Sequence, residues 1–229
     1  MQLLLVRHGQ TPANVLGELG TRIPGPGLTP LGERQAAAVP DVLGRREIDA
    51  IFVSLMVRTH LTAAPLAAAR RLRPVELDGI HEVEAGGLED RSDADAVGIY
   101  QDVLACWAGG DTSVSMPGGP DGAAFLGRFD ASVAAVLRSG AATAVVFSHG
   151  ASIRAWTGAR ADNLDAAFVR THRLGNTGLV EMRGDFATGW TCVSWRSDPV
   201  GGEDLVDRSA SDPTGEAATA TADGRACSP

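Results

Sequence analysis

Short apolar runs recur along most of the chain. The first run, from Leu3 to Val6, contains no polar residue. A continuous run of this length is typical of a strand that is buried on both faces of a parallel sheet. Comparable runs predict further strands at residues 50–53 and 144–147, and the short segment 75–77 is another candidate strand.

The segments between these runs have the apolar spacing of helices. The Thr29-Pro30 pair is a typical helix start, because threonine caps free N–H groups and proline suits the first helical position. Residues 178–182 and 190–195 alternate instead like antiparallel strands. Strands that alternate with helices predict an α/β fold with three α/β/α layers and a mostly parallel central sheet. The predicted helices cover residues 29–46, 58–71, 93–107 and 123–137, and another begins at residue 151.

Two regions depart from this alternation. Residues 86–120 have a weaker pattern and are predicted to form a small insertion of helix and loop over the sheet. The last 33 residues contain no Ile, Phe, Trp, Tyr or Met, and carry seven acidic residues against two arginines. Such a composition cannot bury enough apolar surface to fold. We therefore expect one domain over residues 1–196 and an acidic, disordered tail over residues 197–229.

Composition and charge exclude several classes of function. A net charge of −8 argues against nucleic-acid partners and against an acidic membrane surface. No stretch approaches the roughly 18 apolar residues of a membrane span, and the amino terminus has no signal-peptide pattern, so we expect a cytoplasmic protein. All 20 basic residues are arginine, and the absence of lysine excludes Schiff-base and Walker A lysine chemistry.

A histidine follows the first predicted strand within the sequence Arg7-His8-Gly9. Ligands of open α/β sheets gather beyond the carboxyl ends of the strands, where His8 is expected to lie. Arg7 supplies a planar guanidinium that suits phosphate or carboxylate. Taken alone, His8 could equally be a nucleophile or a group that caps the end of the strand.

A second histidine repeats this arrangement. His149 follows the strand at 144–147, and Gly150 then opens a helix whose free N–H groups suit an anion. Two such histidines favour a shared pocket over two unrelated capping groups. Arg58, in the first turn of a helix, opposes the helix dipole unless an anion compensates it. Glu82 follows the strand at 75–77 and supplies a carboxylate.

Together these segments resemble the histidine phosphatase superfamily, also called the phosphoglycerate mutase-like family. The resemblance extends over about residues 2–195 and rests on several motifs in the family's order. Thr11 and Asn14 complete an R-H-G-x-T-x-x-N signature with Arg7-His8-Gly9. The remaining motifs are L-T-x-x-G-x-x-Q-A at 28–36, S-x-x-x-R-x-x-x-T-A at 54–63, L-x-E-x-x-x-G at 80–86, P-G-G at 117–119, S-H-G at 148–150 and a family turn at 174–177.

The resemblance implies a phosphoglycerate mutase-like fold, with the insertion over the active site, and a metal-independent phosphomonoesterase. In such an enzyme His8 carries the phosphoryl group as a phosphohistidine. Glu82 then serves as general acid and base, which requires its protonated form near the working pH and predicts an activity optimum on the acid side of neutral. The phosphate-binding groups implied are Arg7, Asn14, Arg58, His149 and Gly150, and no cofactor is implied.

Alternatives remain at three points. Glu84 lies two residues beyond Glu82 and is a rival for the acid, although the register of the motif favours Glu82. A phosphoglycerate mutase activity, or an inactive protein that binds a phosphorylated ligand, would use the same pocket. The expected substrate is a small phosphomonoester whose identity is open, because the loop at 23–27 and Asp90 depart from the family pattern. A homodimer is compatible with the sequence, which does not determine the oligomeric state.

Overall fold

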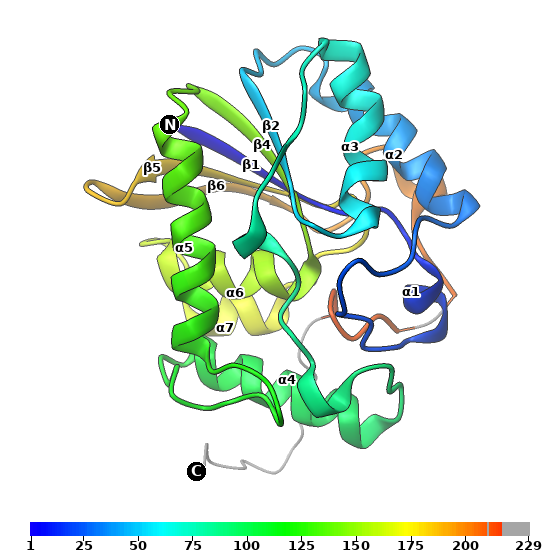
Figure 1. Ribbon diagram of the computed structural model, residues 1–229, viewed down its shortest axis with the longest axis vertical. Helices are drawn as coiled ribbons and strands as arrows, with labels where there is room; N and C mark the ends of the chain where they lie inside the picture. Colours follow the sequence, from blue (N-terminus) through cyan, green and yellow to red (C-terminus); the bar gives the residue numbers. More distant parts are fainter. Residues whose placement is uncertain (210, 217–229) are drawn as a thin grey trace.

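A six-stranded sheet forms the centre of the computed structural model, which describes residues 1–209 and 211–216 (Figure 1). The strand order is β3-β2-β4-β1-β5-β6. The first four strands of this order pair in parallel, whereas β5 is antiparallel to both β1 and β6. The mostly parallel sheet is therefore confirmed. The strands are β1 (Gln2–Arg7), β2 (Ala50–Val53), β3 (Val75–Glu76), β4 (Thr143–Ser148), β5 (Leu179–Asp185) and β6 (Gly189–Arg196).

Both faces of the sheet are covered by helices. Leu3 and Leu5 pack into one core cluster, whereas Leu4 and Val6 pack into a second cluster on the opposite face. Burial of each such side chain contributes about 1.5–3 kcal/mol, which explains why the strand is apolar from Leu3 to Val6. Helices α2 (Pro30–Leu43) and α3 (Val57–Arg70) cover one face, and α4 (Ala94–Ala108), α5 (Gly122–Arg138), α6 (Gly150–Arg160) and α7 (Ala166–Thr171) lie on the other side (Figure 1).

Helix boundaries follow the local capping signals. The Thr29 hydroxyl accepts a hydrogen bond from the backbone N–H of Gly32, and Pro30 is the first helical residue of α2, as predicted. Asp93 and Asp121 cap α4 and α5 in the same way. Each cap supplies an acceptor to N–H groups that have no partner within the helix, so these ends are set by the local sequence.

Two short helices, α1 (Pro12–Leu16) and α7, were not expected from the apolar spacing. Helix α1 begins with a capping box in which Thr11 and Asn14 exchange hydrogen bonds between side chain and backbone. It lies directly after the Arg-His-Gly sequence and has a single buried residue, Asn14. A helix of this length carries no clear apolar period, which is why the pattern of hydrophobic positions did not reveal it.

Part of the acidic tail packs on the domain. Residues 211–216 return to the carboxyl ends of β1 and β4, where Asp212 and Thr214 are buried. The backbone N–H of Leu174 donates to the carbonyl of Gly215 over 2.8 Å. The disorder expected for residues 197–229 therefore does not describe this segment, because polar contacts that composition does not reveal hold it in place. Residues 210 and 217–229 lie outside the described residues.

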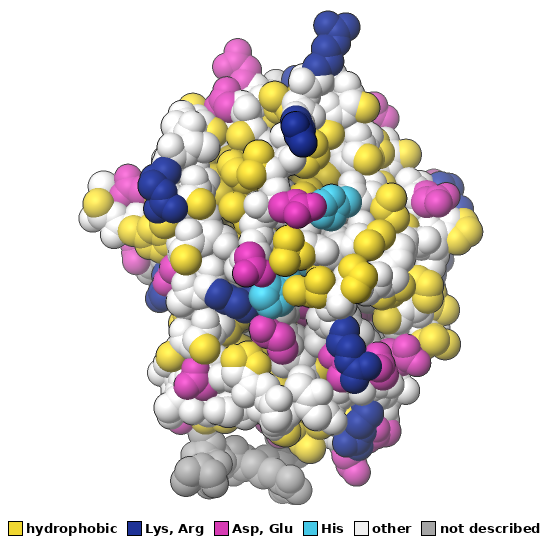
Figure 2. All heavy atoms as spheres, viewed as in Figure 1, with side chains coloured by type: hydrophobic (Ala, Val, Ile, Leu, Met, Phe, Trp, Pro, Cys, Tyr) yellow, Lys and Arg dark blue, Asp and Glu magenta, His cyan; other side chains and the backbone are white. Residues whose placement is uncertain are grey.

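Acidic, basic and hydrophobic side chains are interspersed on the face shown in Figure 2, so neither charge dominates that face. Within the described ranges, no helix is both long enough and apolar enough to cross a membrane.

Candidate active site

The pairing of β1 with β4 brings the two strand-end histidines together. Arg7 pairs with Ser148 in the parallel register, so His8 and His149 leave the sheet at the same level. The backbone N–H of His8 donates to the Ser148 carbonyl over 3.0 Å, and the two imidazole centroids lie 5.1 Å apart. The two histidines that the sequence predicted to lie together thus meet at the carboxyl edge of the sheet.

The ring of His8 is oriented by its neighbouring backbone. Its Nδ1 lies 2.8 Å from the Gly9 carbonyl, which can only accept a hydrogen bond, so Nδ1 carries the proton and Nε2 has a free lone pair. Burial, followed by the charges of Arg58 and Arg7, holds the pKa of His8 well below its usual value. His8 is therefore neutral near pH 7, the protonation state that a nucleophile needs.

Gly9 allows close packing beneath this histidine. Its N–H donates to the Thr62 hydroxyl over 2.9 Å, which ties the R-H-G sequence to helix α3. A Cβ at Gly9 would lie 2.7 Å from the carbonyl oxygen of Gly32, closer than real Cβ contacts allow. Glycine at this position is thus a packing requirement, since α2 approaches the backbone directly.

Arg58 and His149 contact each other. The Arg58 Nε donates to the His149 Nδ1 over 3.2 Å, so the proton of His149 resides on Nε2, which lies 2.8 Å from the Ser54 hydroxyl. Burial, followed by the charge of Arg58, holds the pKa of His149 well below its usual value. Burial also lowers the pKa of Arg58 to about 10, so the guanidinium remains charged at neutral pH.

Glu82 is anchored at the start of α6. Its Oε1 accepts hydrogen bonds of 2.9 Å from the N–H groups of Val83 and Ser152 and from the Ser152 hydroxyl. Its Oε2 accepts a single, longer bond of 3.3 Å from the N–H of Ala151. The carboxylate is fully buried. Three of these four donors lie in the first turn of the helix that His149 precedes, so Glu82 connects its own loop to the histidine pocket.

Glu84 is held in a different set of contacts. Its Oε1 lies 3.0 Å from the His81 Nε2, and its Oε2 accepts a 2.9 Å bond from Arg128. Burial would raise the pKa of Glu84, but the hydrogen bond from His81 and the charge of Arg128 outweigh it and lower this pKa to about 2. A carboxylate that stays ionised at this level is a poor proton donor, which argues against Glu84 as the acid.

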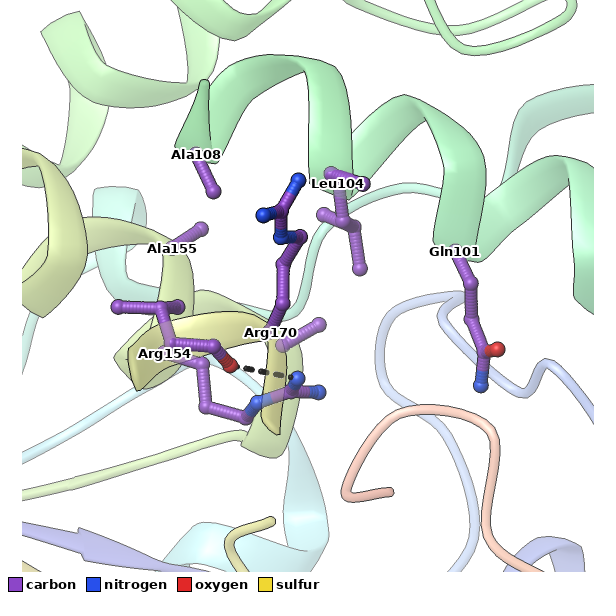
Figure 3. Close-up of a pocket in the computed structure, with 9 residues that line it drawn as sticks. Gln101, Leu104, Ala108, Arg154, Ala155 and Arg170 are labelled. Carbon is purple, nitrogen blue, oxygen red and sulfur yellow. Dashed lines mark hydrogen bonds between the residues drawn. The ribbon is translucent and has the colours of Figure 1, made fainter. Parts of the chain in front are cut away.

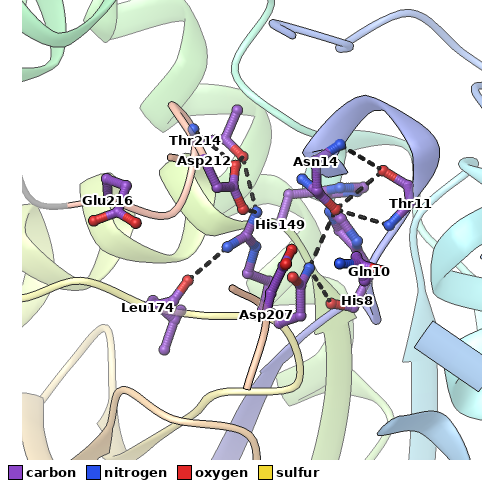
Figure 4. Close-up of polar contacts among 12 residues, drawn as sticks. His8, Gln10, Thr11, Asn14, His149, Leu174, Asp207, Asp212, Thr214 and Glu216 are labelled. Carbon is purple, nitrogen blue, oxygen red and sulfur yellow. Dashed lines mark hydrogen bonds and ion pairs between the residues drawn. The ribbon is translucent and has the colours of Figure 1, made fainter. Parts of the chain in front are cut away.

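Arg7 is occupied by groups from the end of the chain. Its Nη1 donates to the Leu174 carbonyl over 2.8 Å. Its Nη2 donates to the Asp212 carboxylate, with which it forms an ion pair, and to the Thr214 hydroxyl over 3.0 Å. The Nε is buried without a hydrogen-bond partner. Figure 4 shows Asp212 and Thr214 close to the site that contains His8 and His149.

The remaining expected donors lie beside the histidines. Asn176 Nδ2 lies 3.2 Å from both the His8 carbonyl and the Asn14 Oδ1, so Asn14 is linked to the nucleophile through Asn176. A Cβ at Gly150 would lie 3.0 Å from the Arg7 Nε, which places this glycine at the unpartnered edge of Arg7. The sequence had identified Asn176 only as part of a turn and did not identify Asp212 or Thr214.

Two clefts differ greatly in the space that they offer a ligand. A cleft of about 330 Å³ opens beside the loop whose Gly20 carbonyl accepts a hydrogen bond from Arg58. A second cleft, between α4, α6 and α7, has a volume of about 20 Å³ and can hold little more than one water molecule (Figure 3). The larger cleft is lined by Thr21, Arg22, Ile23, His81, Glu84, Gly86 and Glu89.

The described residues contain no group of three or more His, Cys, Asp or Glu side chains that could hold a metal ion. Charge in the pocket comes instead from Arg7 and Arg58, both of which are buried.

Comparison with known proteins identifies the class to which this fold and site belong. The sequence matches the profile of the histidine phosphatase superfamily (branch 1) over residues 3–198. The chain therefore belongs to this superfamily, which confirms the resemblance drawn from its motifs. The match ends before residues 211–216, so the segment on Arg7 lies beyond the part that the family shares.

Individual relatives include phosphatases. The PE-PGRS family protein PE_PGRS11 of Mycobacterium tuberculosis is 39% identical over 86% of this chain, and the matched region makes up 36% of that longer protein. Phosphoserine phosphatase 1 of Hydrogenobacter thermophilus is 29% identical over 68% of this chain and 74% of its own length. Among solved structures, a mycobacterial glucosyl-3-phosphoglycerate phosphatase superposes with a TM-score of 0.72 and 25% identity, covering 86% of this chain and 99% of that one.

Proposed function

We propose that this protein hydrolyses small phosphomonoesters without a metal ion, through a phosphohistidine on the Nε2 of His8. The observation that carries the proposal is the neutral His8 ring, whose Nε2 lone pair is free and whose neighbours are two buried arginines and a second histidine. Phosphoryl transfer depends mainly on positioning and on charge stabilisation, and the pocket supplies both.

The first step forms the phosphoenzyme. The Nε2 of His8 attacks phosphorus in line, and the bond to the leaving oxygen breaks. Arg7 and Arg58, with Asn14 and the N–H of Gly150, stabilise the oxygens of the transferring group, and His149 joins them when its Nε2 proton turns from the Ser54 hydroxyl to a phosphate oxygen. Glu82 gives its proton to the leaving alkoxide. The Oε2 of Glu82 is the oxygen suited to carry that proton, because it accepts one long hydrogen bond whereas Oε1 accepts three.

The second step regenerates the enzyme. Glu82, now a carboxylate, takes a proton from water as the water attacks phosphorus. The bond between Nε2 and phosphorus breaks, and inorganic phosphate leaves a neutral His8. Two similar proteins are a phosphoserine phosphatase and a glucosyl-3-phosphoglycerate phosphatase. This similarity supports hydrolysis of small phosphorylated metabolites.

A panel of substrates tests this function. Sugar phosphates, phosphoglycerates, phosphoserine and nucleotides are assayed for phosphate release, with the His8→Ala variant as control. We expect release from at least one class and loss of activity by a factor of at least about 10³ in the variant. Phosphate release that survives in His8→Ala refutes the mechanism. Interconversion of phosphoglycerates without phosphate release identifies a mutase instead, and binding without turnover identifies an inactive phospho-ligand-binding protein.

The cytoplasmic location and a homodimer stay predictions.

A further inference from the structure

Residues 211–216, which we call the C-terminal strap, lie against the pocket that the proposed mechanism requires for phosphate. The Asp212 carboxylate pairs with Arg7, and the Thr214 hydroxyl accepts a second hydrogen bond from the same Nη2 (Figure 4). Both side chains are buried, although this part of the chain is rich in polar residues. A buried carboxylate on a phosphate-binding arginine makes the contact that a phosphate oxygen would make.

The donors of Arg7 show that strap and phosphate compete. A guanidinium binds phosphate best through two parallel N–H groups on one edge, such as Nε with Nη2. The Nε of Arg7 has no partner, whereas its Nη2 donates to both Asp212 and Thr214. A phosphate that binds this edge must therefore displace at least one strap group from Nη2.

The strap also covers the start of α6. A Cβ built on Gly150 would lie 2.5 Å from the Thr214 carbonyl oxygen, so the backbone of the strap rests on the helix terminus. Further along, the carbonyl of Glu216 accepts a hydrogen bond from Arg154. With the strap in this position Arg7 and His8 are 1% and 2% exposed, so the strap lies over a site that is already deeply buried.

Hydrogen bonds within the strap organise it for this contact. The Asp212 Oδ1 accepts from the Thr214 hydroxyl over 3.0 Å, and the Asp212 carbonyl accepts from the N–H groups of Gly215 and Glu216 over 3.0 and 2.8 Å. The turn thus presents the second carboxylate oxygen of Asp212 to Arg7. An organised turn loses less conformational entropy when it docks than a flexible segment would.

We infer that the C-terminal strap is an intramolecular competitor of the substrate, in which the Asp212 carboxylate occupies Arg7 in place of the phosphate. Substrate enters when the strap leaves, so the segment reduces the affinity of the site for phosphate. The inference rests on the proposed function only for its effect on turnover, because competition for inorganic phosphate can be measured without any reaction.

The test measures the binding of inorganic phosphate to the parent protein, to two point variants and to a truncated chain. Asp212→Asn keeps the shape of the side chain and removes its charge, and a chain ended after Ser209 removes the strap. Glu216→Gln is the matched control, because it removes a charge from the same segment without a contact to Arg7. We expect Asp212→Asn and the truncated chain to bind phosphate about 10-fold more tightly, the scale of one charge-assisted hydrogen bond, and Glu216→Gln to bind as the parent.

Weaker phosphate binding in Asp212→Asn would overturn the inference and make Asp212 a residue that positions Arg7. Equal binding in Asp212→Asn and Glu216→Gln would also overturn it. A thermal unfolding curve accompanies each variant, and Asp212→Asn decides the outcome if the truncated chain does not fold. If phosphate binds more tightly without the strap but no phosphomonoester is hydrolysed, the proposed function fails while the competition stands.

Discussion

Replacing Glu82 by glutamine separates its hydrogen bonds to the start of α6 from its proposed role in proton transfer. Glutamine has the same shape and keeps one carbonyl oxygen, which can still accept from Val83, from the Ser152 N–H and from its hydroxyl. The amide NH₂ then faces the N–H of Ala151, where the carboxylate now accepts a bond of 3.3 Å. Two donors meet there, and no proton can be given to a leaving group.

The contacts set the size of both effects. One weak hydrogen bond is lost and one buried donor is left without an acceptor, for which we expect a loss of about 1–3 kcal/mol in the free energy of unfolding. Loss of a general acid and base lowers the rate of the chemical step by about 10²–10⁴-fold. The expected loss of rate is larger than a small displacement of the start of α6 would cause. The loss of catalysis can therefore be distinguished from the loss of stability.

The assay measures phosphoenzyme formation in a single turnover with two kinds of substrate. An alkyl phosphate has a basic leaving group that needs the proton of Glu82. The leaving group of p-nitrophenyl phosphate is p-nitrophenolate, which is stable without a proton. Glu82→Gln should therefore slow the alkyl substrate by at least about 10-fold more than the aryl substrate. Glu84→Gln is the control, since its carboxylate is tied to His81 and Arg128. Equal slowing of both substrates by Glu82→Gln would refute proton transfer by Glu82 and leave it as an anchor for α6.

Two further predictions concern stability. Because burial holds the pKa values of His8 and His149 below the unfolded value of 6.5, the unfolded chain binds more protons below that pH, and stability should fall as pH drops below 6.5. Urea unfolding between pH 7.5 and 5 should show a slope of up to about 1.4 kcal/mol per pH unit for each histidine, and a flat profile would contradict their neutral burial. Gly9→Ala should lower the free energy of unfolding by about 1–3 kcal/mol, because its Cβ would meet the Gly32 carbonyl at 2.7 Å. The matched change Gly98→Ala, in α4 with nothing within 4 Å, should raise it by about 0.5–1 kcal/mol, and a similar loss in both variants would remove the packing argument.

Most elements of the fold could be predicted from local signals. The sequence-based helix at 123–137 is observed as α5 (Gly122–Arg138), and the strand at 144–147 as β4 (Thr143–Ser148). The helix expected to reach Arg46 ends at Leu43. These elements are recognisable because the buried strands have continuous apolar centres and helices such as α2, α4 and α5 begin at capping residues. Helix α1 was missed because its five residues bury only Asn14.

Prediction of the candidate site was more uneven. His8 and His149 could be placed together because each ends an apolar run before a glycine, and neighbouring parallel strands meet at one edge. The motif register had favoured Glu82 over Glu84, but only the structure shows their different partners, because Ser152 and Arg128 come from different helices.

Local spacing and apolar period therefore determined the strands, the helices and the chemical types at the carboxyl edge of the sheet, since these depend on neighbours within a few residues. Tertiary structure alone decided what occupies Arg7. Asp212 lies 205 residues beyond Arg7 and is one of seven acids in the last 33 residues. Nothing local distinguishes it from the others, because an ion pair over that separation depends on how the whole chain folds. The Arg-His-Gly sequence became a candidate phosphate site only together with its distant partners, and in the folded chain the Asp212 carboxylate pairs with its arginine.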